Sequence, residues 1–95
     1  MKFMTVVEYV PDCSEKLKSI HPAHHNYLKQ FLDNGALRAA GPLANDAGAL
    51  LVLEAKDTAA IDEIVKGDPY ATAGLVASWK TRSLAYFSAK EAIGS

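Results

Sequence analysis

Two stretches of the sequence carry apolar side chains on both alternating faces, and this pattern restricts the possible folds more than any other feature. Side chains of an extended strand point alternately to its two sides. In residues 2–10, one side would carry Phe3, Val7 and Tyr9, and the other Met4, Val6 and Val10. In residues 49–55, the alternating pairs are Leu51 with Leu53 and Leu50 with Val52. We therefore expect a sheet that is buried on both faces.

A long helix is predicted to follow the first strand, residues 2–10. Pro11 ends the strand, and either Asp12 or Ser14 can cap a helix. Beyond these residues, apolar and aromatic side chains and one histidine recur at helical spacing: Leu17, Ile20, His24, Tyr27, Leu28 and Phe31. Asn34 and Gly35 are typical of a helix end.

The second half of the chain continues this alternation of strands and helices. A short strand, residues 36–43, is ended by Pro42, and a turn over residues 44–48 leads to the strand at 49–55. Asp57 caps a second helix, whose apolar stripe is Ala60, Ile61, Ile64 and Val65. A short helix from Pro69 to about Leu75 precedes the last strand, residues 76–87, and residues 88–95 form a C-terminal tail.

This order of elements, β-α-β-β-α-β, predicts an α+β protein with a ferredoxin-like sandwich and an antiparallel sheet. The 95 residues form a single domain, residues 1–95, because no linker divides them. Two helices can cover only one face of such a sheet, and a monomer would leave the other apolar face in water. We therefore expect a homodimer that packs sheet against sheet.

Charge and composition argue against several partners. Ten basic and eleven acidic residues give a formal charge of -1 with no basic stripe, so nucleic acid is not expected as a partner. No apolar run approaches the roughly 20 residues that cross a bilayer, so no membrane partner is expected. The single cysteine, Cys13, has no disulfide partner, and together with the lack of a secretory leader it favours a cytoplasmic protein.

No cofactor and no metal ion are predicted. The sequence has neither a glycine-rich phosphate loop nor a dinucleotide fingerprint. His21, His24 and His25 could supply two metal ligands, but no cysteine or acidic pattern completes a site. Cys13 falls in a loop without neighbours that would activate it as a nucleophile.

His24 and Asp68 are the candidates for chemistry. His24 is on the apolar line of its helix and should face the sheet, whereas His21 and His25 should face solvent. Asp68 precedes Pro69 and is typical of a helix N-cap, a role that leaves carboxylate lone pairs free for an imidazole. A structural histidine and a capping aspartate would explain the same residues without chemistry, and this alternative stays open.

Together these motifs resemble those of the YCII-related (YciI-like) proteins of the dimeric α+β barrel superfamily. The family signature combines a histidine helix, a Gly-x-Leu, a Gly-Pro strand end, and a late Asp-Pro-Tyr followed by a glycine. The matching residues are His24, Tyr27, Leu28, Gly35, Leu37, Gly41, Pro42, Asp68, Pro69, Tyr70 and Gly74. The resemblance extends from the first strand to the last.

The resemblance implies a dimeric α+β barrel with a pocket between helices and sheet, and a dyad formed by His24 and Asp68. Many relatives carry arginine where this chain has His21, so anion binding would differ here or come from Arg38 or Arg82. One branch of the family eliminates chloride from a chlorinated hydroxyhydroquinone. The wider superfamily includes muconolactone isomerase and cofactor-free monooxygenases.

Several other residues have structural interpretations. Gly41 and Pro42 can bring bare backbone close to a ligand or simply shape a strand end. Asp62 and Glu63 are expected on a solvated helix edge. The aromatic residues expected in the barrel or dimer core are Trp79, Tyr86 and Phe87.

These expectations favour a cofactor-free lyase or isomerase that acts on a small cyclic or aromatic metabolite. His24 would be the general base or acid, and Asp68 would orient its ring. Tyr70 or the backbone near Gly41 would bind a developing oxyanion, and His21 and Pro42 would complete the substrate site. The alternative is a non-catalytic dimeric module that binds a small molecule or has a stress-related structural role.

Overall fold

The computed structural model describes residues 1–86, and it has the predicted order of strands and helices. The elements are β1 (Lys2–Tyr9), α1 (Ser14–Asp33), β2 (Leu37–Pro42), the short 3₁₀ helix η1 (Ala44–Asp46), β3 (Gly48–Glu54), α2 (Thr58–Gly67), α3 (Pro69–Thr72) and β4 (Val76–Leu84). The strands form one sheet in the order β2-β3-β1-β4, and every pair is antiparallel. The ferredoxin-like α+β fold is confirmed. Phe87 and the predicted tail, residues 88–95, lie outside the described residues.

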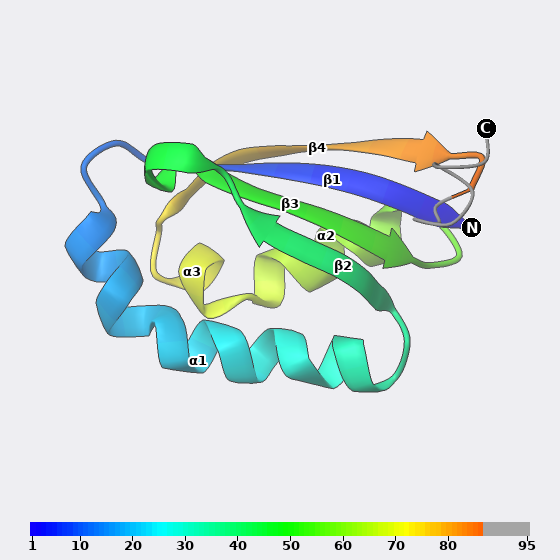
Figure 1. The fold of residues 1–95 in the computed structure, drawn as a ribbon, viewed down its shortest axis with the longest axis horizontal. Helices are drawn as coiled ribbons and strands as arrows, with labels where there is room; N and C mark the ends of the chain where they lie inside the picture. Colours follow the sequence, from blue (N-terminus) through cyan, green and yellow to red (C-terminus); the bar gives the residue numbers. More distant parts are fainter. Residues whose placement is uncertain (87–95) are drawn as a thin grey trace.

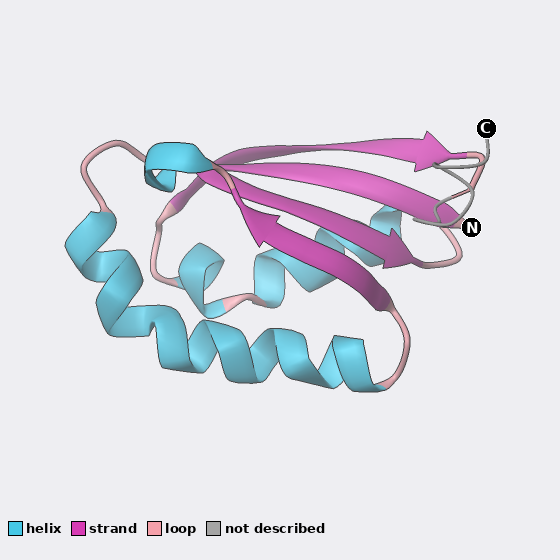
Figure 2. Ribbon diagram, in the orientation of Figure 1, coloured by secondary structure: helices cyan, strands magenta, loops and turns pink. Residues whose placement is uncertain are grey.

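The helices α1, α2 and α3 all lie on one side of the sheet (Figure 1). Figure 1 shows α1 running along the sheet, with α2 and α3 beside it on the same side, and Figure 2 shows the two layers. The other face of the sheet carries no helix among residues 1–86. The central strands β1 and β3 therefore have one face against helices and one face without them.

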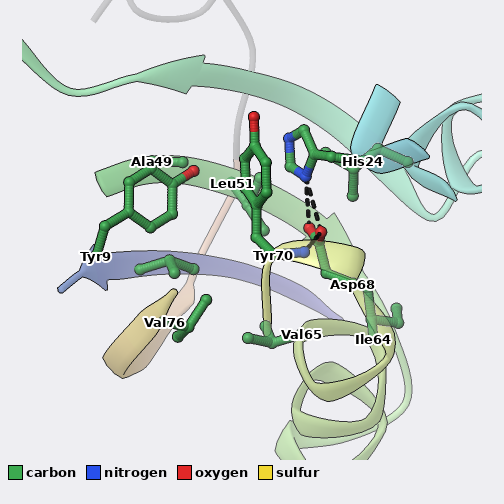
Figure 3. A pocket seen from close by; sticks show the side chains of 11 residues that line it. Tyr9, His24, Ala49, Leu51, Ile64, Val65, Asp68, Tyr70 and Val76 are labelled. Carbon is green, nitrogen blue, oxygen red and sulfur yellow. Dashed lines mark hydrogen bonds and ion pairs between the residues drawn. The ribbon is translucent and has the colours of Figure 1, made fainter. Parts of the chain in front are cut away.

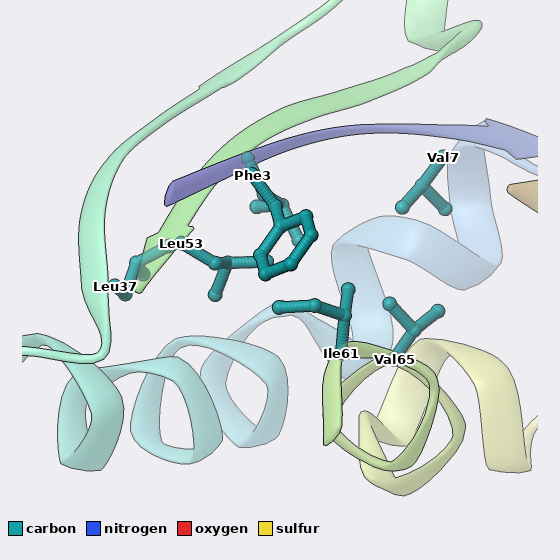
Figure 4. Close-up of a cluster of buried hydrophobic side chains, with 7 residues drawn as sticks. Phe3, Val7, Leu37, Leu53, Ile61 and Val65 are labelled. Atoms are coloured by element: carbon teal, nitrogen blue, oxygen red, sulfur yellow. The ribbon is translucent and has the colours of Figure 1, made fainter. Parts of the chain in front are cut away.

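The main core lies between the sheet and the helices (Figure 4). Its buried members are Phe3, Val7, Leu37, Leu51, Leu53, Ile61 and Val65. Strand register then decides the face that each alternating set occupies. Leu51 pairs with Thr5, which is fully buried, and Leu50 pairs with Val6 on the face without helices. Leu51 and Leu53 thus belong to the core, and Leu50 and Val52 to the opposite face.

The predicted cap of α1 is wrong. The residue before the helix is Cys13, which makes no side-chain cap, and Asp12 has a left-handed backbone with φ of 56°. Ser14 instead donates its hydroxyl hydrogen to Asp46 Oδ2 at 2.7 Å, so it ties the helix start to η1. Pro22 lies inside α1 and cannot donate to the carbonyl one turn earlier, which accounts for the bend in α1 in Figure 1.

The cap predicted for α2 is confirmed, because Asp57 accepts a hydrogen bond from the Ala60 amide at 2.9 Å. Asp62, predicted on a solvated edge, instead accepts a hydrogen bond from the Trp79 indole at 2.9 Å. Trp79 is partly buried and packs against the main core, with its indole N–H satisfied by Asp62. Tyr86 is 52% exposed, so it adds nothing to the core of a single chain.

The helices of residues 1–86 are each too short or too polar to cross a lipid bilayer.

Candidate functional site

Asp68 is held at the junction of two helices. Its amide donates to the Val65 carbonyl at the end of α2, and its Oδ1 accepts from the Tyr70 amide at 2.9 Å as the N-cap of α3. The backbone of Asp68 is extended, with ψ of 133°, as the ring of the following Pro69 requires. The backbone and the carboxylate of Asp68 are therefore each held by a hydrogen bond, and the carboxylate has accepting capacity left over.

His24 uses that remaining capacity. Its Nδ1 lies 2.8 Å from each carboxylate oxygen of Asp68 (Figure 3), and the two side chains are only 15% and 13% exposed. A carboxylate can only accept, so Nδ1 carries the hydrogen in this contact. In the neutral ring Nε2 then holds a lone pair, and it points away from Asp68 (Figure 3).

Tyr70 supports the imidazole of His24 from one side. The two rings stack with centroids 3.9 Å apart and planes 10° apart. The Tyr70 hydroxyl donates to the Leu17 carbonyl at 3.3 Å, so it is engaged with α1. Burial, and then the carboxylate of Asp68, raises the pKa of Tyr70, which keeps that hydroxyl protonated.

Tyr27 links α1 to α2 one turn beyond His24. Its hydroxyl donates to the Ile64 carbonyl at 2.7 Å, one of the carbonyls that the end of α2 leaves without a helical partner. Gly67 makes room for this contact, since a Cβ there would lie 2.5 Å from the Tyr27 hydroxyl oxygen. Burial, followed by Asp68, raises the pKa of Tyr27. This hydrogen bond and the His24–Asp68 contact hold α1 against the α2–α3 junction.

A groove of about 690 Å³ opens between α1 and the edge of the sheet. It is lined by residues that include His21, His24, Gly41, Pro42 and Tyr70. A smaller cavity of about 20 Å³, large enough for one water molecule, adjoins His24 and Asp68 beneath it. The groove has the volume of a small-molecule site. The predicted site residues therefore meet in one place, with Asp68 behind His24.

The predicted sources of positive charge lie elsewhere. Arg38 and Arg82 are exposed, and neither lines the groove. Lys18, which the sequence analysis did not single out, does line it, together with the exposed His21 and His25. A Cβ at Gly41 would meet no atom within 4 Å, so the backbone of Gly41 is open on that side.

Tyr9 also belongs to the candidate site, although the sequence analysis placed it only on one apolar side of the first strand. It lines both the groove and the small cavity. Its ring meets Tyr70 edge to face, with centroids 5.5 Å apart and planes at 81°. Burial, then Tyr70 and Asp68, raises the pKa of Tyr9 well above its ordinary value. Its position at the end of the first strand could have suggested this place in the groove only if the arrangement of β1 against α1 had been known.

Among residues 1–86, no group of three or more His, Cys, Asp and Glu side chains is arranged to hold a metal ion.

A family model described as the YCII-related domain matches residues 1–84. A similar solved structure is 5-chloro-2-hydroxyhydroquinone dehydrochlorinase from Burkholderia phenoliruptrix, in complex with 2,5-dihydroxybenzoquinone. It is 22% identical, with a TM-score of 0.80 over 92% of this chain and 96% of that chain, a likeness that shows the fold. No curated protein matches the sequence.

Proposed function

The chain belongs to the YCII-related family, and we propose that it is a cofactor-free lyase or isomerase that acts on a small cyclic or aromatic metabolite. The observation that carries this proposal is the contact of His24 Nδ1 with Asp68, beside a groove of ligand size. The contact leaves Nε2 of a neutral imidazole available for proton transfer.

In the proposed reaction, His24 Nε2 takes a proton from a ring carbon next to a carbonyl group. The electron pair of the broken C–H bond moves toward the carbonyl oxygen, which becomes an enolate. In an isomerase the proton returns to a different carbon, whereas in a lyase the electrons expel a leaving group from the neighbouring carbon. Asp68 stabilises the imidazolium that forms and keeps the ring in position.

The similar dehydrochlorinase supports the choice of reaction class. Its name describes removal of chloride from a hydroxylated aromatic ring, a lyase reaction. A ring substrate suits a groove whose walls include the flat side chains of Tyr9 and Tyr70.

We also propose that two copies of the chain pack sheet against sheet. The face of the sheet without helices carries Met4, Val6, Leu50 and Val52 near its centre. Val52 is already only 5% exposed, whereas Met4, Val6 and Leu50 are partly exposed, and a second copy of the chain would remove these three from water, the usual fate of an apolar patch on a soluble protein.

The alternative is a module that binds a small molecule without converting it. One observation favours this alternative: Asp68 already has a structural task, because it caps α3 through the Tyr70 amide. A capping carboxylate and a packed histidine would satisfy each other in a protein that performs no chemistry.

Turnover measurements separate the two functions. Substituted hydroquinones and hydroxyquinones, chlorinated ones included, are incubated with the protein, and products are detected by chromatography. We expect His24→Ala to lower kcat by about 10²–10⁴-fold on any substrate found. Asp68→Asn should also lower kcat, and its matched control is Asp33→Asn, because Asp33 is exposed and pairs with Lys29. A His24→Ala variant that is as fast as the wild type would rule out the proposed chemistry, and binding without turnover would favour the module.

A further inference from the structure

We propose that the Tyr9 hydroxyl donates a hydrogen bond to the ring oxygen on which negative charge develops when His24 takes a proton. This inference rests on the proposed function and extends it in two ways. It assigns an oxyanion-stabilising residue, and it limits the substrate to rings that carry a carbonyl or phenolic oxygen.

The position of Tyr9 is fixed by the sheet. Tyr9 is the last residue of β1, a strand with a neighbour on each side. Its amide donates to the Ala47 carbonyl at 2.9 Å, and the next amide, of Val10, donates to the Leu75 carbonyl at 2.8 Å. The pairing of β1 with β4 shifts register between Glu8 and Tyr9, a bulge of the kind that re-aims side chains beside functional sites. The phenol is thus carried by a rigid backbone.

Tyr9 and His24 lie on the two sides of Tyr70. The imidazole stacks on the Tyr70 ring at 3.9 Å, and the Tyr9 ring meets the same ring edge to face at 5.5 Å. Figure 3 shows Tyr70 between the other two side chains. All three line the groove, so a ligand there can reach both the Nε2 of His24 and the hydroxyl of Tyr9. The base, His24, and the hydrogen-bond donor, Tyr9, can therefore act on two different atoms of one substrate ring.

The Tyr9 hydroxyl is free to bind a ligand. By contrast, the hydroxyls of Tyr27 and Tyr70 donate to the carbonyls of Ile64 and Leu17. Within residues 1–86, no protein group forms a hydrogen bond with the Tyr9 hydroxyl, and this oxygen is not among the polar atoms shut off from solvent. Burial raises the pKa of Tyr9, so the group remains a hydrogen-bond donor at neutral pH and does not become a competing base.

A pair of ring probes tests the proposal. The phenolate of 4-nitrophenol carries an oxyanion, and nitrobenzene has nearly the same shape without one. Affinities are measured for the wild type, for Tyr9→Phe, which keeps the ring, and for Tyr86→Phe, which removes the hydroxyl of an exposed tyrosine outside the groove. Circular dichroism checks that each variant is folded.

We expect Tyr9→Phe to weaken phenolate binding by about 10- to 100-fold, the effect of losing one hydrogen bond to a charged group. Nitrobenzene binding should not change, and Tyr86→Phe should match the wild type with both probes. Equal affinity of Tyr9→Phe and wild type for the phenolate would overturn the proposal. So would an equal loss for both probes, which would mean that Tyr9 only shapes the groove, or a wild type that does not bind the phenolate. Turnover that depends on His24 would leave the proposed function standing in each of these cases.

Discussion

One carboxylate, that of Asp68, holds two neighbours in place. It caps α3 through the Tyr70 amide, and it receives the Nδ1 hydrogen of His24. Because Tyr70 also stacks on the imidazole, the cap and the His24–Asp68 contact orient the same ring from two directions. The structural and chemical interpretations of Asp68 are therefore compatible: the cap supplies the rigidity that a general base needs.

The tyrosines around this carboxylate predict how stability depends on pH. The pKa values of Tyr9, Tyr27 and Tyr70 are raised above the ordinary value of 10.0, so the folded protein keeps protons that the unfolded chain releases. The free energy of unfolding should be unaffected by these groups below about pH 10 and should fall as the pH rises above it. Urea unfolding monitored by Trp79 fluorescence measures this dependence. Tyr9→Phe should make the decline shallower, and an unchanged slope would contradict the burial of Tyr9.

At the residue scale, local patterns singled out His24 and Asp68, and the family resemblance paired them as a dyad. A histidine on an apolar helical line and an aspartate before a proline are patterns within a few residues. Tyr9 and Lys18 were not predicted as site residues, because their place in the groove depends on how β1 and α1 lie against each other. No spacing within a single element contains that information.

At the scale of the elements, α1 is held to the α2–α3 junction by few polar contacts. Tyr27 donates to the Ile64 carbonyl, and Gly67 leaves the space for its hydroxyl. His24 lies one turn before Tyr27 on the same helix, so this hydrogen bond helps to set the distance between His24 and Asp68.

Tyr27→Phe should therefore cost stability, because it leaves the Ile64 carbonyl without its partner. We expect the free energy of unfolding to fall by about 1–2 kcal/mol, as for other hydrogen bonds to partly buried carbonyls. Chemical denaturation measures this value. Tyr86→Phe is the matched control, since Tyr86 is exposed. A Tyr27→Phe variant as stable as the wild type would mean that this hydrogen bond does not hold the helices together.

The helices and strands were largely predictable from the sequence, and the wrong predictions about their polar side chains share one cause. Apolar periodicity and the Asp57 cap are local, and both appear in the structure as expected. The cap of α1 was wrong because Ser14 bonds to Asp46, 32 residues away. Asp62 was assigned to solvent because its partner, Trp79, comes from β4. Patterns among neighbouring residues cannot predict the contacts of a polar side chain whose hydrogen-bond partner lies on a distant element.

At the scale of the whole molecule, the apolar sheet face without helices is the feature on which the proposed dimer rests. The sequence established that both faces are apolar, but alternation alone could not assign Leu50 and Leu51 to their faces. The register does so, because Leu51 pairs with the buried Thr5 and is itself 5% exposed, whereas Leu50 pairs with Val6 on the other face.

This assignment predicts different results for two neighbouring substitutions. Leu50→Lys should give a folded monomer, because the charge would face the second copy of the sheet. Leu51→Lys should unfold the chain, because it buries a charge in the core without a partner. Light scattering should give about twice the chain mass of 10.2 kDa for the wild type and the single mass for Leu50→Lys. A wild type that is monomeric at micromolar concentration would contradict the dimer.

The proposed chemistry requires that Asp68 hold the His24 ring with its hydrogen on Nδ1, so that Nε2 presents a lone pair to the groove. Nitrogen-15 NMR of the histidine rings distinguishes the two neutral forms, since a protonated and an unprotonated ring nitrogen resonate far apart. The measurement requires no substrate, and Asp68→Asn is its matched variant. We expect a His24 ring protonated on Nδ1 in the neutral wild type, with this preference weakened in Asp68→Asn. A neutral wild-type ring protonated on Nε2 would leave the groove without a base and would contradict the proposed function.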